Sequence, residues 1–100
     1  MRVRLTRPAN DELIDILDYL AERSPQAADG FSRRFDRLLV QLASGPFTGV
    51  ESGFEGIRRL PTNPYPYLVF YRVRADLVEI VAIRHGARDP ASMPGAKGAP

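Results

Sequence analysis

Hydrophobic and polar residues alternate at the start of the chain and then change to a helical spacing. Residues 2–6 place Val3 and Leu5 on one face and charged or polar side chains on the other, which is typical of a half-buried strand. After Pro8, a residue that suits the first turn of a helix, apolar positions recur every three or four residues. The pattern predicts a strand followed by an amphipathic helix that ends near Arg23, with its apolar stripe at Ala9, Leu13, Ile16, Leu17 and Leu20.

A second helix is predicted directly after the first. Ser24 and Pro25 form a cap-then-proline signal for a helix start, and a Ser-Gly-Pro sequence at 44–46 ends the apolar stripe that follows. Two amphipathic helices with so short a link are expected to form an antiparallel hairpin. The stripe, in which we expect Phe35, Leu38 and Leu39 to be deeply buried, consists of Ala28, Phe31, Phe35, Leu38, Leu39 and Leu42.

The second half of the chain carries strand patterns separated by turns. Residues 45–56 are rich in glycine and are predicted to form a loop, and strands are expected near 57–60, 65–73 and 77–85. The order of a strand, a helix hairpin and a three-stranded antiparallel meander predicts an α+β domain. In this fold the helices pack on one face of an antiparallel sheet.

The last two predicted strands have apolar residues on both faces. A helix hairpin of this size can cover only one face fully. Two readings are open: the strands are central and the tail or a loop covers the remainder, or a partner protein binds the leftover surface.

Length and composition are those of a small globular domain. The chain has 100 residues, of which 44% are hydrophobic and 26% charged. We expect one domain over residues 1–89. Residues 90–100 consist largely of Pro, Gly and Ala, which leaves little to bury, and are predicted to form a flexible tail.

The absence of cysteine excludes several classes of site. A disulfide scaffold, a thiolate metal site and a cysteine nucleophile are all impossible. The other potential metal ligands are scattered carboxylates and one histidine without a recognisable spacing, so no metal or other cofactor is predicted. No apolar run approaches the length that crosses a bilayer, and we expect a cytoplasmic protein that does not enter the membrane.

Charge is unevenly distributed along the chain. The formal net charge is +2, but residues 57–89 hold six arginines against three acids, whereas residues 8–23 hold five acids against one arginine. Arginine suits carboxylate and phosphate partners. The predicted sheet could therefore attract nucleic acid or bind an acidic protein segment, and a merely solvated basic face is the third reading.

Several segments, in this order and spacing, resemble a known family. They are residues 9–20 (ANDELIDILDYL), the second helix entry at Ser24, Pro25, Ala27, Ala28 and Phe31, the spacing of Leu42, Pro46 and Gly49, and residues 56–60 (GIRRL), 67–73 (YLVFYRV) and 80–89 (IVAIRHGARD). Together they resemble the RelE/ParE superfamily of toxins, and its ParE-like branch most closely.

The resemblance implies the toxin of a type II toxin-antitoxin pair, held inactive in a complex with a cognate antitoxin that wraps it. ParE-like members are associated with poisoning DNA gyrase, and RelE-like members cleave mRNA in the ribosome. A non-enzymatic gyrase inhibitor is our first interpretation, and the endonuclease is the alternative.

The alternative requires a recognisable set of catalytic groups. Cleavage through a 2′-hydroxyl needs a base, cations on the phosphate and an acid for the leaving oxygen. Ribonuclease members also carry an aromatic or basic residue after the last strand, where this chain has Gly86 and Ala87. The candidates are Glu51 or Glu55 as base, Arg58, Arg59 and Arg72 as phosphate clamps, and His85 as acid.

Two further interpretations concern single residue types. His85 is either an acid-base group or a structural residue that forms hydrogen bonds at the end of its strand. Tyr67 and Tyr71 alternate within an apolar strand, which favours core packing over stacking on bases.

The arginines predicted to bind a partner are Arg58, Arg59, Arg72, Arg84 and Arg88.

Overall fold

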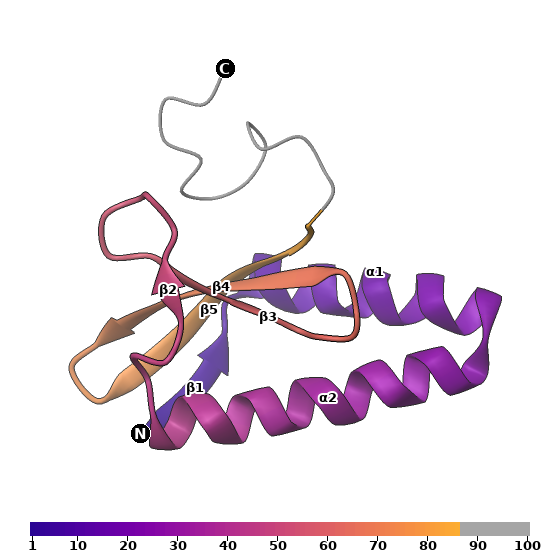
Figure 1. The fold of residues 1–100 in the computed structure, drawn as a ribbon, viewed down its shortest axis with the longest axis horizontal. Coiled ribbons are helices and arrows are strands. Elements are labelled where there is room, and N and C mark those ends of the chain that lie inside the picture. The colour runs from indigo at the N-terminus through magenta and orange to yellow at the C-terminus, as the bar shows by residue number, and fades with distance from the viewer. Residues whose placement is uncertain (87–100) are drawn as a thin grey trace.

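The computed structural model describes residues 1–86, so Arg88 and the predicted tail at 90–100 lie outside the described residues. The elements follow the predicted order (Figure 1). They are β1 (Arg2–Leu5), α1 (Arg7–Arg23), α2 (Pro25–Ser44), β2 (Val50–Glu51), β3 (Arg58–Pro61), β4 (Tyr67–Arg74) and β5 (Leu77–His85). The helix hairpin and the meander of β3, β4 and β5 confirm the α+β prediction.

Local side-chain caps explain where the helices begin. The Thr6 hydroxyl accepts a hydrogen bond from the backbone N–H of Ala9 at 3.4 Å, and Ser24 accepts one from Ala27 at 3.3 Å. Ser24 also ends α1, because its own N–H donates to the Leu20 carbonyl. One residue therefore ends the first helix and caps the second, which fixes the short hairpin link.

The sheet has five strands in the order β1-β5-β4-β3-β2 and is mixed. The predicted antiparallel pairing holds for the meander of β3, β4 and β5, whereas β1, whose position in the sheet the sequence pattern did not indicate, pairs in parallel with β5. The two strands are far apart in sequence, and the alternation of side chains does not encode strand direction. The predicted loop at 45–56 also contains the short strand β2, which pairs with β3 at the other edge.

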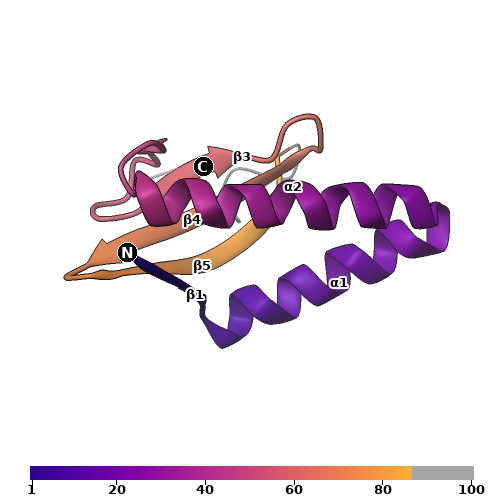
Figure 2. The ribbon, with the colours of Figure 1, turned by 90° about the horizontal axis from the view of Figure 1, so that it is seen from below.

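Both helices lie on the same side of the sheet (Figures 1 and 2). Phe35 and Leu38 are buried as predicted. Leu39 is only half-buried, which corrects that prediction. A helix turns by about 100° per residue, so a stripe centred on Leu38 and Leu42 leaves Leu39 on its flank.

The tyrosines of β4 belong to this core. Tyr67 and Tyr71 are both buried, as predicted, and the Tyr67 ring lies edge-on to Phe31 with centroids 5.3 Å apart. Alternation along β4 then places Phe70 and Arg72 on the other face of the sheet, which we call the outer face. Phe70 and its partner Ala82 are buried there as well.

Within residues 1–86, neither helix is long and apolar enough to cross a membrane.

Candidate functional site

The side chain of Arg58 contacts the segment that leads into β2. Its Nη1 donates a hydrogen bond to the Gly49 carbonyl at 2.7 Å, and its guanidinium carbon lies 5.1 Å from the centre of the Phe47 ring. In the sheet Arg58 is opposite Tyr71 on β4, so it lies on the helix-facing side. These contacts give Arg58 a structural role at the start of β2.

A cavity of about 550 Å³ lies beside Arg58. The two predicted bases, Glu51 and Glu55, line it with Arg58, and so do the exposed rings of Phe47 and Phe54. The structure therefore brings the candidate bases and one candidate clamp to the same place.

His85 lies at the opposite end of β4. It is opposite Tyr67, whose ring it meets edge-on with centroids 5.4 Å apart. Together with Asp15 and Tyr19 of α1, both residues line a second cavity, of about 540 Å³.

Arg58 and His85 are too far apart to act on one bond. Their partners on β4, Tyr71 and Tyr67, are four residues apart, which is roughly 13 Å of strand. β3 and β5 also lie on either side of β4, so the two residues are offset by roughly 10 Å across the sheet, and the two perpendicular offsets place their Cα atoms roughly 16 Å apart. An acid and a base must each reach hydrogen-bonding distance of the reacting group. His85 and the cavity beside Arg58 do not meet this requirement.

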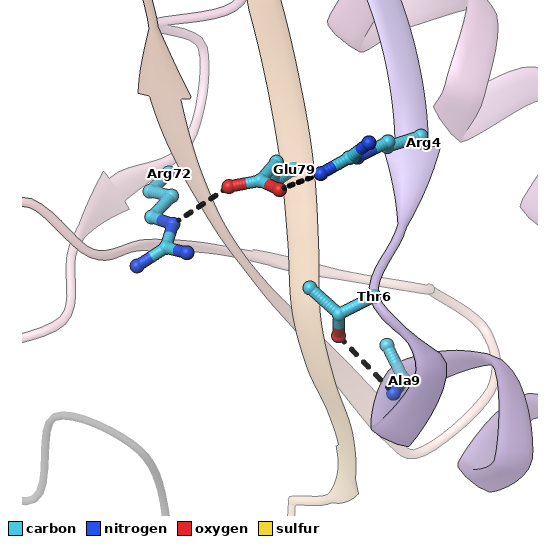
Figure 3. A network of polar contacts seen from close by, with 5 residues as sticks. All are labelled: Arg4, Thr6, Ala9, Arg72 and Glu79. Atoms are coloured by element: carbon cyan, nitrogen blue, oxygen red, sulfur yellow. Dashed lines mark hydrogen bonds and ion pairs between the residues drawn. The ribbon is translucent and has the colours of Figure 1, made fainter.

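Arg72 lies on the outer face, in a network around Glu79 (Figure 3). The Nε of Arg72 donates to Glu79 Oε1 at 3.0 Å, and Nη2 of Arg4 donates to Oε2 at 2.7 Å. The Glu79 side chain is only 6% exposed. The hydrogen bonds from Arg4 and then Arg72 lower the pKa of Glu79 below its ordinary value, against the opposing effect of burial. The four ribonuclease candidates Glu55, Arg58, Arg72 and His85 are thus distributed over two ends and two faces of the sheet.

The other predicted partner-binding arginines differ in their surroundings. Arg59 is exposed and is opposite Phe70, so it shares the outer face with Arg72. Arg84 forms an ion pair with Glu12 of α1, Nε to Oε2 at 2.7 Å. Glu12 Oε1 also accepts the backbone N–H of Ile83 at 3.0 Å, so this carboxylate ties α1 to β5. Arg88 lies outside the described residues.

Three arginines of the outer face were not among the predicted candidates. Arg2 and Arg4 of β1 and Arg74 of β4 are exposed on the same face as Arg72. The alternation at residues 2–6 placed Arg2 and Arg4 together, but it did not indicate which strand lay beside them. The parallel pairing of β1 with β5 brings them close to β4.

Residues 1–86 contain no group of three His, Asp or Glu side chains that could hold a metal ion.

Comparisons with known proteins connect this chain to toxins. Residues 3–90 match a family model described as the ParE toxin of the type II toxin-antitoxin system parDE. Toxin ParE2 of Mycobacterium tuberculosis (strain CDC 1551 / Oshkosh) is 27% identical over 90 residues, which cover 89% of this chain and 85% of that protein. Toxin RelE2 of Caulobacter vibrioides is 38% identical over 77 residues, which cover 77% of this chain and 85% of that toxin.

A solved structure has the same fold. It is described as the chromosomal ParDE TA system from P. aeruginosa, and it superposes with a TM-score of 0.72 at 24% sequence identity. The match covers 85% of this chain and 95% of that chain.

Proposed function

Because this chain belongs to the family of ParE toxins of type II toxin-antitoxin systems, we propose that it arrests growth by binding DNA gyrase in the cytoplasm. A cognate antitoxin neutralises it by forming a complex with it. In this proposal the toxin has no chemical step of its own. The proposal that the toxin has no chemical step is supported by the separation of the ribonuclease candidates across the sheet.

The contacts of the individual candidates support a binding toxin. Arg58 donates to the Gly49 carbonyl, and Arg72 donates to Glu79, so each already contacts a group of the protein itself. The Cα atom of the candidate acid, His85, is roughly 16 Å from the Cα atom of Arg58 by strand geometry. A phosphate clamp and a leaving-group acid act together only when both contact the same phosphodiester.

The surface of α1 supports a bound antitoxin. Ala9 is the only residue of α1 that is buried, and Ile14 and Tyr19 are 47% and 49% exposed. The apolar stripe at Leu13, Ile16, Leu17 and Leu20 is only half-buried against the rest of the protein. An apolar helix face that is only half-buried is typical of a surface that a partner covers.

The ribonuclease candidates provide the test of mechanism. Replacing Glu55 or His85 with Ala in a toxin expressed under control should leave growth arrest nearly unchanged, because gyrase binding has no proton-transfer step. Circular dichroism of each variant shows whether it is folded. A folded His85→Ala variant that loses both toxicity and codon-associated mRNA cuts would overturn the proposal.

The alternative function is a ribosome-dependent mRNA endonuclease. Its support is the 38% identity to a relative named Toxin RelE2. In that case Glu55→Ala and His85→Ala should each reduce mRNA cleavage by about a hundredfold or more, as removal of one catalytic donor commonly does.

The antitoxin surface can be tested separately. Ile14→Asp and Tyr19→Ala should weaken neutralisation by a co-expressed antitoxin without reducing toxicity. Val40→Asp on α2, where Val40 is 70% exposed, is the matched control and should be neutralised like the unmodified toxin. Equal neutralisation of all three variants would show that the antitoxin does not use α1.

A further inference from the structure

Four arginines form a regular array on the outer face of the sheet. The register pairs Arg2 with Leu77 and Arg4 with Glu79 across β1 and β5. It then pairs the same two β5 residues with Arg74 and Arg72 on β4. Arg2 and Arg74 therefore lie on either side of Leu77, and Arg4 and Arg72 lie on either side of Glu79. We call these four residues the arginine quartet: Arg2, Arg4, Arg72 and Arg74.

The spacing of the quartet follows from strand geometry. Residues two apart on one strand and on the same face are separated by about 6.7 Å, and strands β1 and β4 are two strand spacings, about 9.6 Å, apart. The four arginine side chains thus leave the backbone at the corners of a small rectangle on one face of the sheet. The helices cover the opposite face, so they do not cover this array (Figure 2).

The charge of the array is only partly compensated. Glu79 is the carboxylate between Arg4 and Arg72, on one side of the rectangle, and both arginines already bind it. Asp76, in the turn between β4 and β5, is the nearest other acid in sequence to Arg74, and within residues 1–86 it forms no ion pair with the quartet. The quartet with Glu79 therefore carries three positive charges in excess, or two when Asp76 is counted.

Glu79 also organises two of the four arginines. Arg72 uses Nε, and Arg4 uses Nη2, to bind the buried carboxylate. The two terminal nitrogens of Arg72 point away from Glu79 (Figure 3). A guanidinium held in this way keeps donors for a second anion and loses less conformational freedom when it binds one.

We propose that the arginine quartet binds the phosphodiester backbone of nucleic acid. The inference rests on the proposed function, because the target proposed there, a topoisomerase, acts on DNA. A planar array of arginines suits a polyanion with regularly repeated charges, since each arginine forms paired hydrogen bonds with a phosphate. The contact is independent of sequence, because phosphates position a protein on nucleic acid and bases specify it.

The test measures binding of the purified full-length toxin to a fluorescein-labelled 20-base-pair DNA duplex by anisotropy between 50 and 200 mM salt. A single-stranded RNA of equal length is the second probe, and polyglutamate is added as a competitor. If four phosphates are contacted, duplex affinity should fall by about a hundredfold over this salt range.

The diagnostic variant is Arg2→Ala combined with Arg74→Ala, which leaves the Glu79 network in place. The duplex affinity of this variant should fall by only about tenfold over the same salt range, because two phosphate contacts are lost. Arg33→Ala combined with Arg37→Ala on α2 removes the same charge from another surface and is the matched control. It should retain the hundredfold salt dependence.

The outcomes separate this inference from the proposed function. Quartet-dependent binding of the duplex supports a DNA source for the phosphates, and quartet-dependent binding of RNA alone supports an RNA source. Equal loss in the quartet and control variants, or displacement by polyglutamate at matched charge, would overturn the inference. If the toxin inhibits gyrase without binding nucleic acid, only this inference is wrong. If it binds nucleic acid but leaves gyrase active, only the proposed function is wrong.

Discussion

Replacing Tyr71 with phenylalanine removes one oxygen atom from the centre of the protein. The Tyr71 hydroxyl accepts a hydrogen bond from the backbone N–H of Gly49 at 2.9 Å, and the Tyr71 side chain is fully buried. The contact is close, since a Cβ at position 49 would lie 2.5 Å from this oxygen. Burial raises the pKa of the Tyr71 hydroxyl, so it stays protonated at neutral pH.

The expected loss of stability follows from the hydrogen-bond donor that the substitution leaves without an acceptor. In Tyr71→Phe the ring still fills its site, but the buried N–H of Gly49 has no acceptor. An unsatisfied buried donor costs about 1–3 kcal/mol in the free energy of unfolding. For a domain of this size that corresponds to a fall in Tm of roughly 4–24 °C.

Urea unfolding and thermal melts of the purified variant measure this loss. Tyr19→Phe is the matched control, because the Tyr19 side chain is 49% exposed, and its stability should change by less than about 0.5 kcal/mol. If Tyr71→Phe is no more destabilised than Tyr19→Phe, the hydrogen bond from Gly49 to Tyr71 does not contribute to the stability of the protein.

Three further predictions concern the core, the outer face and a helix cap. Phe35→Ala should lower the free energy of unfolding by about 3–5 kcal/mol in urea, because Phe35 is buried in the core, and a neutral effect would contradict the packing of α2 on the sheet. The lowered pKa of Glu79 means that its ionised form stabilises the protein above pH 4.5, and that this stabilisation is lost as pH falls through the lowered pKa. The stability difference between the unmodified protein and Glu79→Gln should therefore shrink from pH 7 to pH 3, and a constant difference would count against the network with Arg4 and Arg72. Thr6→Ala should cost about 0.5–2 kcal/mol in thermal melts through loss of the α1 cap, and no change would mean that the cap contributes nothing.

Features encoded locally were predictable from the sequence. The start of α2 at Pro25 and its end at Ser44 follow from a cap, a proline and a glycine, all of which act over a few residues. The strands of the meander follow from alternation and from turns between neighbours. Strand direction across a long separation has no such signal, so the parallel pairing of β1 with β5 emerged only in the structure.

The same limit applies to the candidate site. Alternation predicts that the adjacent residues Arg58 and Arg59 point to opposite faces, and the structure shows that Arg59 is the one on the face of Arg72. It could not show that Arg58 and Arg72 would each be bound by a group of the protein, because Gly49 and Glu79 meet them only through tertiary pairing. Arg2 and Arg4 were overlooked for the same reason.

The central claim is that this toxin acts on gyrase by binding, and a supercoiling assay tests it most directly. Purified toxin is titrated into gyrase with relaxed plasmid DNA and ATP, and the same preparations are added to a translating extract in which mRNA integrity is followed. We expect loss of supercoiling with intact mRNA, for the unmodified toxin and for His85→Ala alike. Full supercoiling activity together with cutting of the mRNA, abolished in a folded His85→Ala variant, would contradict it.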